Sequence, residues 1–345
     1  MIPARLQFLA RPELPPAQLA QVFQQAGEEI FLVGGSVRDA FLERPLEDFD
    51  FATRARPDRV KELLAPWADA IYDVGARFGT VAALRDGHTV EITTYRSEVY
   101  RDDSRKPHVT YSKEIETDLS RRDFTVNAVA LSLPDLKPVD PYDGLVDMAR
   151  SVLRTPLDPE ISFGDDPLRM LRLFRFQATL GFTPHGEAVE AVREMAPRLE
   201  IISAERIRDE LSKLLVAKAP GDSLRLIVET GLADHFISEL SGLAMEQDPE
   251  HLHKDVLAHT FAVVDKTSPD LVLRLAALFH DIGKPDTRQF GPGGVTFHHH
   301  EVVGARIGRR RLRALRYPKE IIDDVSQLVF MHLRPHTLKL GWTDS

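Results

Sequence analysis

Two aspartates separated by one residue, Asp48 and Asp50, are the first residues of this sequence that indicate a specific chemistry. They lie near the end of residues 31–53, FLVGGSVRDAFLERPLEDFDFAT. Alternate residues of a β-strand point to the same face, so both carboxylates should project together while Phe49 and Phe51 face the core. Carboxylates this close repel each other unless a cation neutralises them, and Mg²⁺ prefers such oxygen ligands. Taken alone, the pair fits the solvent-exposed face of an edge strand at least as well.

A pair of glycines, Gly34 and Gly35, precedes the aspartates and changes this interpretation. They join an expected strand to an expected helix, where backbone N–H groups can approach a phosphate and the helix N-terminus adds its positive end. Arg38 lies in the first turn of that helix. Because the connection at 43–47 returns the chain to the next strand, glycines and carboxylates should share one edge of the sheet. This arrangement suits nucleotidyl transfer with two metal ions about 3.5–4 Å apart.

A third acid should come from an adjacent strand. Glu91, in the strand-like stretch HTVEITTYR, is the best candidate. The alternative is that Glu91 is an ordinary surface acid of that strand.

The order of elements predicts an α+β head followed by an all-helical remainder. Alternation and turn signals predict the strands, three-to-four spacing of apolar residues predicts the helices, and 101–108 is expected to be a mobile loop. Strands are expected at 29–33, 49–52, 71–74, 79–84, 89–95 and 127–133. Helices are expected at 37–42, 58–65, 168–182, 203–217, 257–264, 271–279 and 301–315. The predicted domains are a head at 1–145, a helical neck at 146–220 and a helical body at 221–345.

The composition of the 345 residues excludes several classes of protein. Hydrophobic residues make up 43% and charged residues 28%, and no run is long enough to cross a bilayer. The absence of cysteine excludes disulfides, thiolate metal sites and a cysteine nucleophile, and without a secretory pattern the cytoplasm is the expected location. The net charge of -9 argues against a uniformly basic nucleic-acid coat.

One basic segment departs from this balance. Residues 306–319, RIGRRRLRALRYPK, contain seven cations and no acid. The segment is either a solvated helix face or a phosphate-binding strip.

Five ordered motifs run from residue 34 to residue 211. They are GGSVRD with DFDFAT, RRDFTVNA at 121–128, DPYDG at 140–144, DDPLRMLRLFRF at 165–176 and SAERIRDEL at 203–211. Together they resemble the class II tRNA nucleotidyltransferases and bacterial poly(A) polymerases. The resemblance implies a nucleotidyltransferase head of the polymerase β type with a small mixed sheet, followed by a helical neck and body. It also implies Mg²⁺ held by Asp48 and Asp50.

The resemblance implies roles for the residues of DDPLRMLRLFRF. Asp166 and Arg169 would act as a protein template that selects CTP or ATP, because a carboxylate and a guanidinium can pair with the Watson–Crick edge of a base. Arg172 and Arg175 would face the nucleotide or the primer backbone, unless this is merely a wet helix face. Asp165 stands where the family usually has Glu, so no role is assigned to it.

The resemblance also implies roles within RRDFTVNA. Arg122 would contact the nucleotide, and Asp123 and Asn127 would orient it. Asp123 could equally be a buried salt-bridge partner of one of the arginines.

Two further segments bear on the product. GARFGTV at 75–81 looks like the tRNA branch of the family rather than the GRRF-like segment of poly(A) polymerases. The loop within 95–121 looks full length, whereas enzymes that add only CC resemble a version with part of it deleted. The expected function is therefore template-independent addition of CMP or AMP, from CTP or ATP, to the tRNA 3′ end by a CCA-adding or A-adding enzyme. A poly(A) polymerase is the alternative within the family.

Most of the thirteen histidines lie after residue 250. Imidazoles and a carboxylate there could converge on one or two metals, and their arrangement resembles an HD phosphohydrolase domain. The candidate ligands of a divalent transition metal are His259, His280 and Asp281, with His298 and His300 as further candidates, while His253 is more consistent with a structural role. A last acidic ligand has no evident position before GWTDS, so this region is expected to be truncated or degenerate.

Other functions follow from these patterns as alternatives. The HD-type region favours a metal-dependent phosphohydrolase as a second activity or as the main one. A DxD glycosyltransferase would not need the ordered arginine motifs, and a non-catalytic RNA-binding module would not need three convergent acids.

Overall fold

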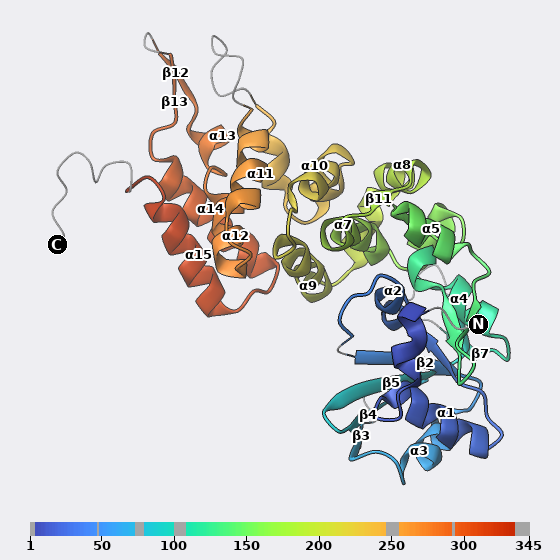
Figure 1. Ribbon diagram of the computed structural model, residues 1–345. Helices are drawn as coiled ribbons and strands as arrows, with labels where there is room; N and C mark the ends of the chain where they lie inside the picture. The colour runs from blue at the N-terminus through green and yellow to red at the C-terminus, as the bar shows by residue number, and fades with distance from the viewer. Residues whose placement is uncertain are drawn as a thin grey trace. The chain divides into compact units, whose positions relative to one another are not determined.

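The computed structural model describes residues 4–46, 48–72, 79–99, 108–245, 255–291 and 294–334. The chain divides into two units, Met1–Asp165 and Asp166–Ser345 (Figure 1). None of the described helices is long and apolar enough to cross a membrane. Several expectations fall outside the described residues: Glu47, most of GARFGTV at 75–81, part of the loop within 95–121, His253 and the ending GWTDS.

A seven-stranded mixed sheet forms the centre of the first unit. Its strand order is β3-β4-β5-β2-β1-β8-β9. β2 and β5 pair in parallel, and the other pairs are antiparallel. The strands are β1 (Phe31–Val33), β2 (Asp48–Thr53), β3 (Ala70–Tyr72), β4 (Thr80–Arg85), β5 (His88–Thr94), β8 (Ala130–Ser132) and β9 (Lys137–Val139).

One row of apolar side chains crosses this sheet and defines its buried face. The register aligns residues from five neighbouring strands, each at most 1% exposed. The row is Leu131, Leu32, Phe51, Ile92 and Val81. Because side chains alternate along a strand, the next row, which contains Asp50 and Glu91, must face the other way.

Short helices and a two-stranded antiparallel sheet complete the first unit. α2 contacts β1 and β2, and α3 packs against β4 and β5. The helices are α1 (Pro15–Gln25), α2 (Gly35–Phe41), α3 (Pro57–Leu64), α4 (Ile115–Ser120), α5 (Gly144–Arg150) and α6 (Pro159–Asp165), with 3₁₀ turns η1 (Ala4–Ala10) and η3 (Thr125–Asn127). The remaining strands are β6 (Arg96–Val99), paired with β7 (His108–Tyr111), and β10 (Val152–Leu153).

The strand expected at 127–133 is shorter than the sequence suggested. η3 occupies its beginning, and β8 starts only at Ala130. The Thr125 N–H donates to the Arg154 carbonyl, and the Asn127 side chain donates to Asp123, so these polar groups hold the chain in a turn.

The second unit is mainly helical. α7 packs against α9 and α10, and α15 packs against α12 and α14. The helices are α7 (Leu168–Leu180), α8 (Gly186–Met195), α9 (Ala204–Leu215), α10 (Gly221–Glu229), α11 (Val256–Lys266), α12 (Leu271–Phe279), α13 (Lys284–Thr287), α14 (His300–Ala314) and α15 (Lys319–Met331), with 3₁₀ turns η4 (Ala196–Ile201), η5 (Leu232–His235) and η6 (Ser238–Leu243). It also contains the short strand β11 (Thr183–Pro184) and a hairpin of β12 (Gln289–Gly291) and β13 (Gly294–Thr296).

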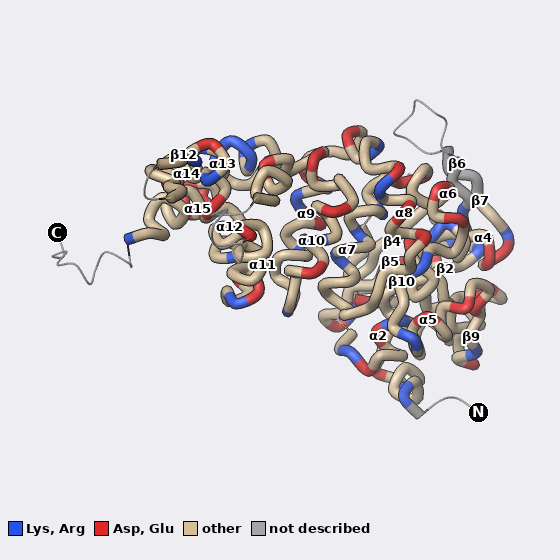
Figure 2. Tube along the Cα trace, turned by 90° about the horizontal axis from the view of Figure 1, so that it is seen from above, with Lys and Arg blue, Asp and Glu red and all other residues tan. Residues whose placement is uncertain are grey.

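Local signals explain where the expected helices begin and end. α7 stops at Gly181, whose φ of 74° is a left-handed conformation that glycine adopts without strain. α9 begins after Ser203, whose hydroxyl accepts a hydrogen bond from the Arg206 N–H, and Asp270 caps α12 in the same way. Figure 2 shows that acidic and basic residues are interspersed along both units, in agreement with the modest net charge.

Candidate functional site

Three carboxylates meet on one face of the sheet in the first unit. Asp48 and Asp50 lie on β2, and the parallel register places Asp50 directly beside Glu91 on β5. Asp48 and Glu91 are exposed and Asp50 is half-buried, whereas Phe49 and Phe51 are buried on the opposite face. The structure therefore brings together the three acids that the sequence singled out.

The electrostatics of these acids favour a bound cation. Burial raises the pKa of Asp50; Arg122 opposes this effect, the charge of Asp48 adds to it, and Arg38 opposes it. Burial also raises the pKa of Glu91, and the charges of Asp50 and Asp48 raise it further. Neighbouring carboxylates that are costly to ionise together are the usual environment of a divalent ion with oxygen ligands. This donor set fits Mg²⁺.

The glycine turn brings an arginine and an aspartate close to the backbone. Gly34 has a φ of 69°, and a Cβ placed there would lie 2.7 Å from Nη1 of Arg122 and 3.6 Å from Oδ2 of Asp50. A side chain at this position would be strained and would displace the guanidinium. The Ser36 hydroxyl accepts a hydrogen bond from the Asp50 N–H (3.0 Å) and donates to the Asp48 carbonyl (3.2 Å), which fixes α2 against β2.

Arg38 belongs to a chain of buried polar side chains. Its Nη1 donates to Oδ1 of Asn127 at 2.7 Å, and Nδ2 of Asn127 donates to Oδ1 of Asp123 at 2.8 Å. Its Nε and Nη2 donate to the two carboxylate oxygens of Asp39 at 2.9 and 2.7 Å. The backbone N–H of Phe124 also donates to Asp123. The nucleotide-binding candidates on α2 and η3 are therefore held as one unit.

Asp118 orients the two arginines of RRDFTVNA. Its side chain is fully buried, and its two oxygens accept hydrogen bonds from Arg121 (3.0 Å) and Arg122 (3.1 Å). Burial alone would raise the pKa of Asp118, but Arg121 and Arg122 together lower it. Asp118 was not predicted from the sequence, although its spacing of three and four residues before the two arginines was the available signal.

Replacing Asp118 with Asn should destabilise the protein by about 3 kcal/mol, because removing one partner of a buried pair leaves the other uncompensated. A carboxyl whose pKa is lowered on folding makes its full contribution to stability above the pKa of the unfolded state, about pH 4. This contribution is lost as the pH falls from there through the lowered pKa of the folded state. The difference in unfolding free energy between wild type and Asp118→Asn should therefore be largest at neutral pH and shrink in acid. Denaturant titrations at several pH values measure it, with the exposed Asp58→Asn as control. A difference that is equally large at pH 3 would contradict the assignment.

In the second unit, α9 holds the polar residues of α7 in place. Nη2 of Arg206 lies 2.7 Å from Oδ2 of Asp166. Buried Glu210 accepts hydrogen bonds from Arg172 (3.2 Å) and Arg175 (2.8 Å). Arg206 and Glu210 are one helical turn apart, so a single face of α9 contacts this motif.

The arginines of α7 do not form a simple solvent-exposed helix face. Arg169 is buried, and its N–H donates to the Asp166 carbonyl one turn earlier. The sequence analysis identified SAERIRDEL as a motif but did not identify Arg206 and Glu210 as partners of α7. Only tertiary packing brings these charges together.

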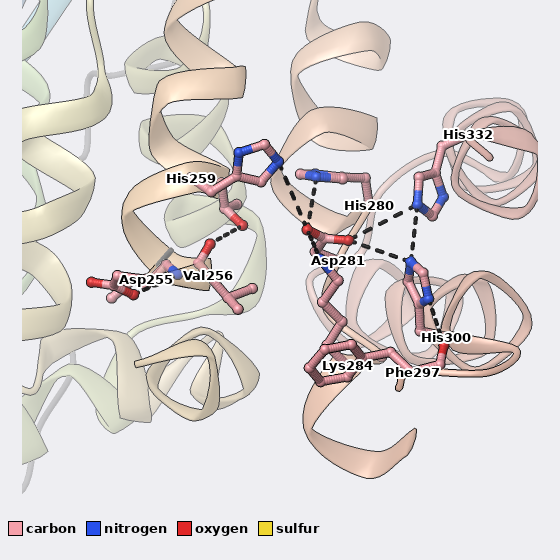
Figure 3. Close-up of polar contacts among 12 residues, drawn as sticks. Asp255, Val256, His259, His280, Asp281, Lys284, Phe297, His300 and His332 are labelled. Atoms are coloured by element: carbon pink, nitrogen blue, oxygen red, sulfur yellow. Dashed lines mark hydrogen bonds and ion pairs between the residues drawn. The ribbon is translucent and has the colours of Figure 1, made fainter. Parts of the chain in front are cut away.

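A histidine cluster surrounds Asp281 in the second unit (Figure 3). Oδ2 of Asp281 lies 3.1 Å from Nε2 of His280 and 3.9 Å from Nε2 of His259. Its Oδ1 lies 3.4 Å from Nε2 of His300 and 3.9 Å from Nε2 of His332. Two groups of three ligand atoms result, each within 4.8 Å of one another, and both groups share Asp281.

Backbone carbonyls orient three of these imidazoles. Nδ1 of His280, His300 and His332 lies 2.7–2.8 Å from the carbonyl oxygen of the residue three positions earlier. Because Nδ1 must donate to a carbonyl, Nε2 faces the cluster: it donates to Asp281 in the protonated imidazole and would offer its lone pair to a metal in the neutral one. Burial would raise the pKa of Asp281, but hydrogen bonds from His280 and His300 hold it well below its usual range.

The cluster opens into a cavity of about 1010 Å³, whose lining includes all five of these residues. His298 also lines the cavity but, within the described residues, joins neither group of ligand atoms. His332 was missed because the sequence analysis searched for an acid on a later helix. The structure instead places an imidazole directly after α15.

Three protein-family models match this chain. The one described as "Poly A polymerase head domain" matches residues 30–154, and "Probable RNA and SrmB- binding site of polymerase A" matches 181–243. The HD domain model matches residues 244–341.

A solved structure titled as a Bacillus stearothermophilus CCA-adding enzyme in complex with CTP matches over both units. It is 30% identical, with a TM-score of 0.71, and the match covers 96% of this chain and 73% of that one. The chain belongs to the CCA-adding enzyme and poly(A) polymerase family. A further CCA-adding enzyme solved with CTP is 20% identical with a TM-score of 0.65 and shares the fold.

Curated members of the family agree in sequence over part of their length. The CCA-adding enzyme of Leuconostoc citreum is 42% identical over 212 residues, which are 61% of this chain and 51% of that protein. The enzyme of Streptococcus gordonii is 39% identical over 239 residues, 69% of this chain and 58% of that protein. This chain thus spans little more than half the length of these relatives. The expected family and fold class are confirmed.

Proposed function

We propose that the protein is a template-independent tRNA 3′-terminal nucleotidyltransferase that adds CMP and AMP from CTP and ATP. The observation that carries this proposal is the convergence of Asp48, Asp50 and Glu91 on one sheet face beside Gly34 and Arg122. Membership of the CCA-adding enzyme and poly(A) polymerase family supports it. A cytoplasmic location is part of the proposal, since both substrates are found there.

The acids would hold Mg²⁺, with Asp48 and Asp50 as the principal ligands and Glu91 as the third acid. Bound Mg²⁺ supplies Lewis-acid activation of the attacking 3′-hydroxyl and charge neutralisation of the pyrophosphate leaving group. Arg122, held by Asp118 against Gly34, would neutralise the triphosphate. Gly35 and Arg38 would complete the phosphate contacts, and Asp123 and Asn127 would keep Arg38 in position.

Base selection is assigned to Asp166 and Arg169. Arg206 would hold the Asp166 carboxylate in a fixed direction, so that it accepts from the base amino group while Arg169 donates. Glu210 would fix Arg172 and Arg175 along the same helix. The related CCA-adding enzyme of Bacillus stearothermophilus was solved in complex with CTP, which supports a pyrimidine triphosphate as one substrate.

Replacing Glu210 with Gln should weaken nucleotide selection, because Arg172 and Arg175 lose the buried charge that positions them. We expect discrimination of CTP from UTP, measured as the ratio of kcat/KM values, to fall by about tenfold, which corresponds to about 1.4 kcal/mol. Glu205→Gln, an exposed change on the same helix, is the control. Unchanged discrimination in Glu210→Gln would assign these ion pairs to stability alone.

Incubation with defined RNA ends and each nucleoside triphosphate separately tests the proposal. With Mg²⁺, the protein should add AMP to a tRNA that ends in CC. Extension of a tRNA lacking CCA only as far as CC would contradict AMP incorporation, and a long A tail would identify a poly(A) polymerase. No transfer to any end would overturn the proposal.

The histidine cluster favours a second activity, a metal-dependent phosphohydrolase. Asp281 presents one oxygen to each of two histidine pairs, so Asp281 with His259, His280, His300 and His332 would hold divalent transition metals, which would supply Lewis-acid activation of a phosphoryl group. Lys284, which lies 2.7 Å from Asp281, adds a positive group for an anionic phosphoryl substrate, and the exposed His298 and His299 add hydrogen-bonding groups at the cavity. Hydrolysis of phosphorylated or cyclic-phosphate ends in the presence of Mn²⁺, Ni²⁺ or Co²⁺, and its loss in His280→Ala, would support this assignment. Equal hydrolysis by both proteins would remove it.

A further inference from the structure

Helix α14 carries the densest group of positive charges in the chain. Residues 306–319 hold seven cations and no acid, although the whole protein has a net charge of -9. None of these residues belongs to the histidine cluster. The segment also lies outside residues 181–243, which match the RNA-binding family model.

The fold itself uses some of these cations. Arg311 makes a two-point ion pair with Glu239, at 2.9 and 3.0 Å, and also donates to the Phe236 carbonyl. Arg309 pairs with Asp323 on α15 at 2.7 Å. These arginines hold α14 against its neighbours and are accounted for by stability.

Three of the remaining arginines, all on α14, form a different surface. Arg306, Arg310 and Arg313 are all exposed, and Arg310 approaches Glu239 only at 3.5 Å with 72% of its side chain exposed. Among the described residues, the side chains of Arg306 and Arg313 make no hydrogen bond or ion pair, although the Arg313 carbonyl accepts from the Arg316 N–H. At 3.6 residues per turn the three lie within about 60° of arc on one side of the helix, about 6 and 4.5 Å apart along its axis.

This geometry suits a linear array of negative charges. Of the three guanidinium groups only that of Arg310 approaches a described acid, at 3.5 Å, so the three positive charges repel one another, a cost that a polyanion removes. Their axial separation is of the order of the phosphate spacing along a nucleic-acid strand. A cavity of about 440 Å³ between α14 and α15 is lined by Arg306 but by neither Arg310 nor Arg313, so it adjoins one end of this row of arginines.

We propose that Arg306, Arg310 and Arg313 form a contact strip for the phosphate backbone of the acceptor RNA. The inference rests on the proposed function, since it takes RNA as the substrate, and it assigns part of the binding energy to the HD-type region. The contact is with phosphates, so it should not depend on base sequence.

The test compares wild type with the triple variant Arg306→Gln, Arg310→Gln, Arg313→Gln. Binding of a tRNA lacking CCA, and of RNA hairpins of unrelated sequence, is measured by fluorescence anisotropy at several salt concentrations. We expect the triple variant to bind all of these RNAs at least tenfold more weakly at low salt. The plot of log association constant against log salt concentration has a negative slope. In the triple variant this slope should become less negative by about two to three, one for each lost phosphate contact. In transfer assays, KM for RNA should rise and KM for CTP should not.

A matched control removes the same charge outside both the strip and residues 181–243. Arg59→Gln, Lys137→Gln, Lys266→Gln changes three exposed cations and should leave RNA affinity within about twofold. Equal loss in both variants would mean that only net charge matters and would overturn the strip. Unchanged binding and salt slope in the strip variant would overturn it even if nucleotide addition is normal. Strip-dependent binding without any nucleotide addition would uphold the strip and reject the proposed function.

Discussion

Replacing Asp50 with Asn should reduce nucleotide addition by at least about 10³-fold while making the metal-free protein more resistant to unfolding. The loss of activity follows because an amide cannot replace a carboxylate that holds Mg²⁺ and fixes the reacting groups. The gain in stability follows because burial and the neighbouring charge of Asp48 make an ionised Asp50 unfavourable, as its raised pKa shows. Initial rates with Mg²⁺ and thermal unfolding in a chelator measure the two effects.

The control for this change is Asp58→Asn, which removes a 97% exposed side chain of α3 in the same unit. It should alter neither the rate nor the unfolding temperature. Glu91→Gln should give a smaller loss of rate than Asp50→Asn, because Glu91 is proposed as the supporting acid. If Asp50→Asn retains transfer within tenfold of wild type, the three acids are not the metal site.

Replacing Asp281 with Asn should remove metal from the second unit. Asp281 is the only residue shared by the two groups of ligand atoms, so both positions should lose affinity, each by at least about 100-fold. Metal content after dialysis against Mn²⁺ or Ni²⁺ measures this, with His298→Ala as a control that leaves both groups intact. Equal metal content in wild type and Asp281→Asn would reject the site.

His332 offers a finer test of the same centre. It contributes to only one of the two groups, so His332→Ala should lower the metal content from two equivalents to one. Loss of both metals would show that the two positions fill together, and loss of neither would exclude His332 as a ligand.

The acids of the first unit were predictable because strand alternation is a local rule. DFDFAT fixes which residues share a face, and the adjacent strand HTVEITTYR has one acid in the matching register. Asp118 and Glu210 escaped the sequence analysis for the opposite reason. Each is an ordinary helical acid whose importance arises from burial beneath two arginines, and burial is decided by packing.

The histidine cluster shows a second limit. His259, His280, Asp281 and His300 were identified from residue type, but the search for a closing carboxylate passed over His332. A search restricted to carboxylates was too narrow, because an imidazole nitrogen at the same place can bind a metal equally well. The antiparallel pair of β12 and β13 was also unexpected, because three residues in each strand give little periodicity.

Lys284 gives the histidine centre a resident counter-ion. Its ammonium lies 2.7 Å from Asp281, in the place where positive charge from a metal would act. A metal bound at this proposed site would therefore replace one cation with another rather than neutralise a bare buried anion. The second unit should accordingly keep its fold in the presence of a chelator. The affinity of the histidine centre for metal would depend on the free energy needed to move the Lys284 ammonium away from Asp281.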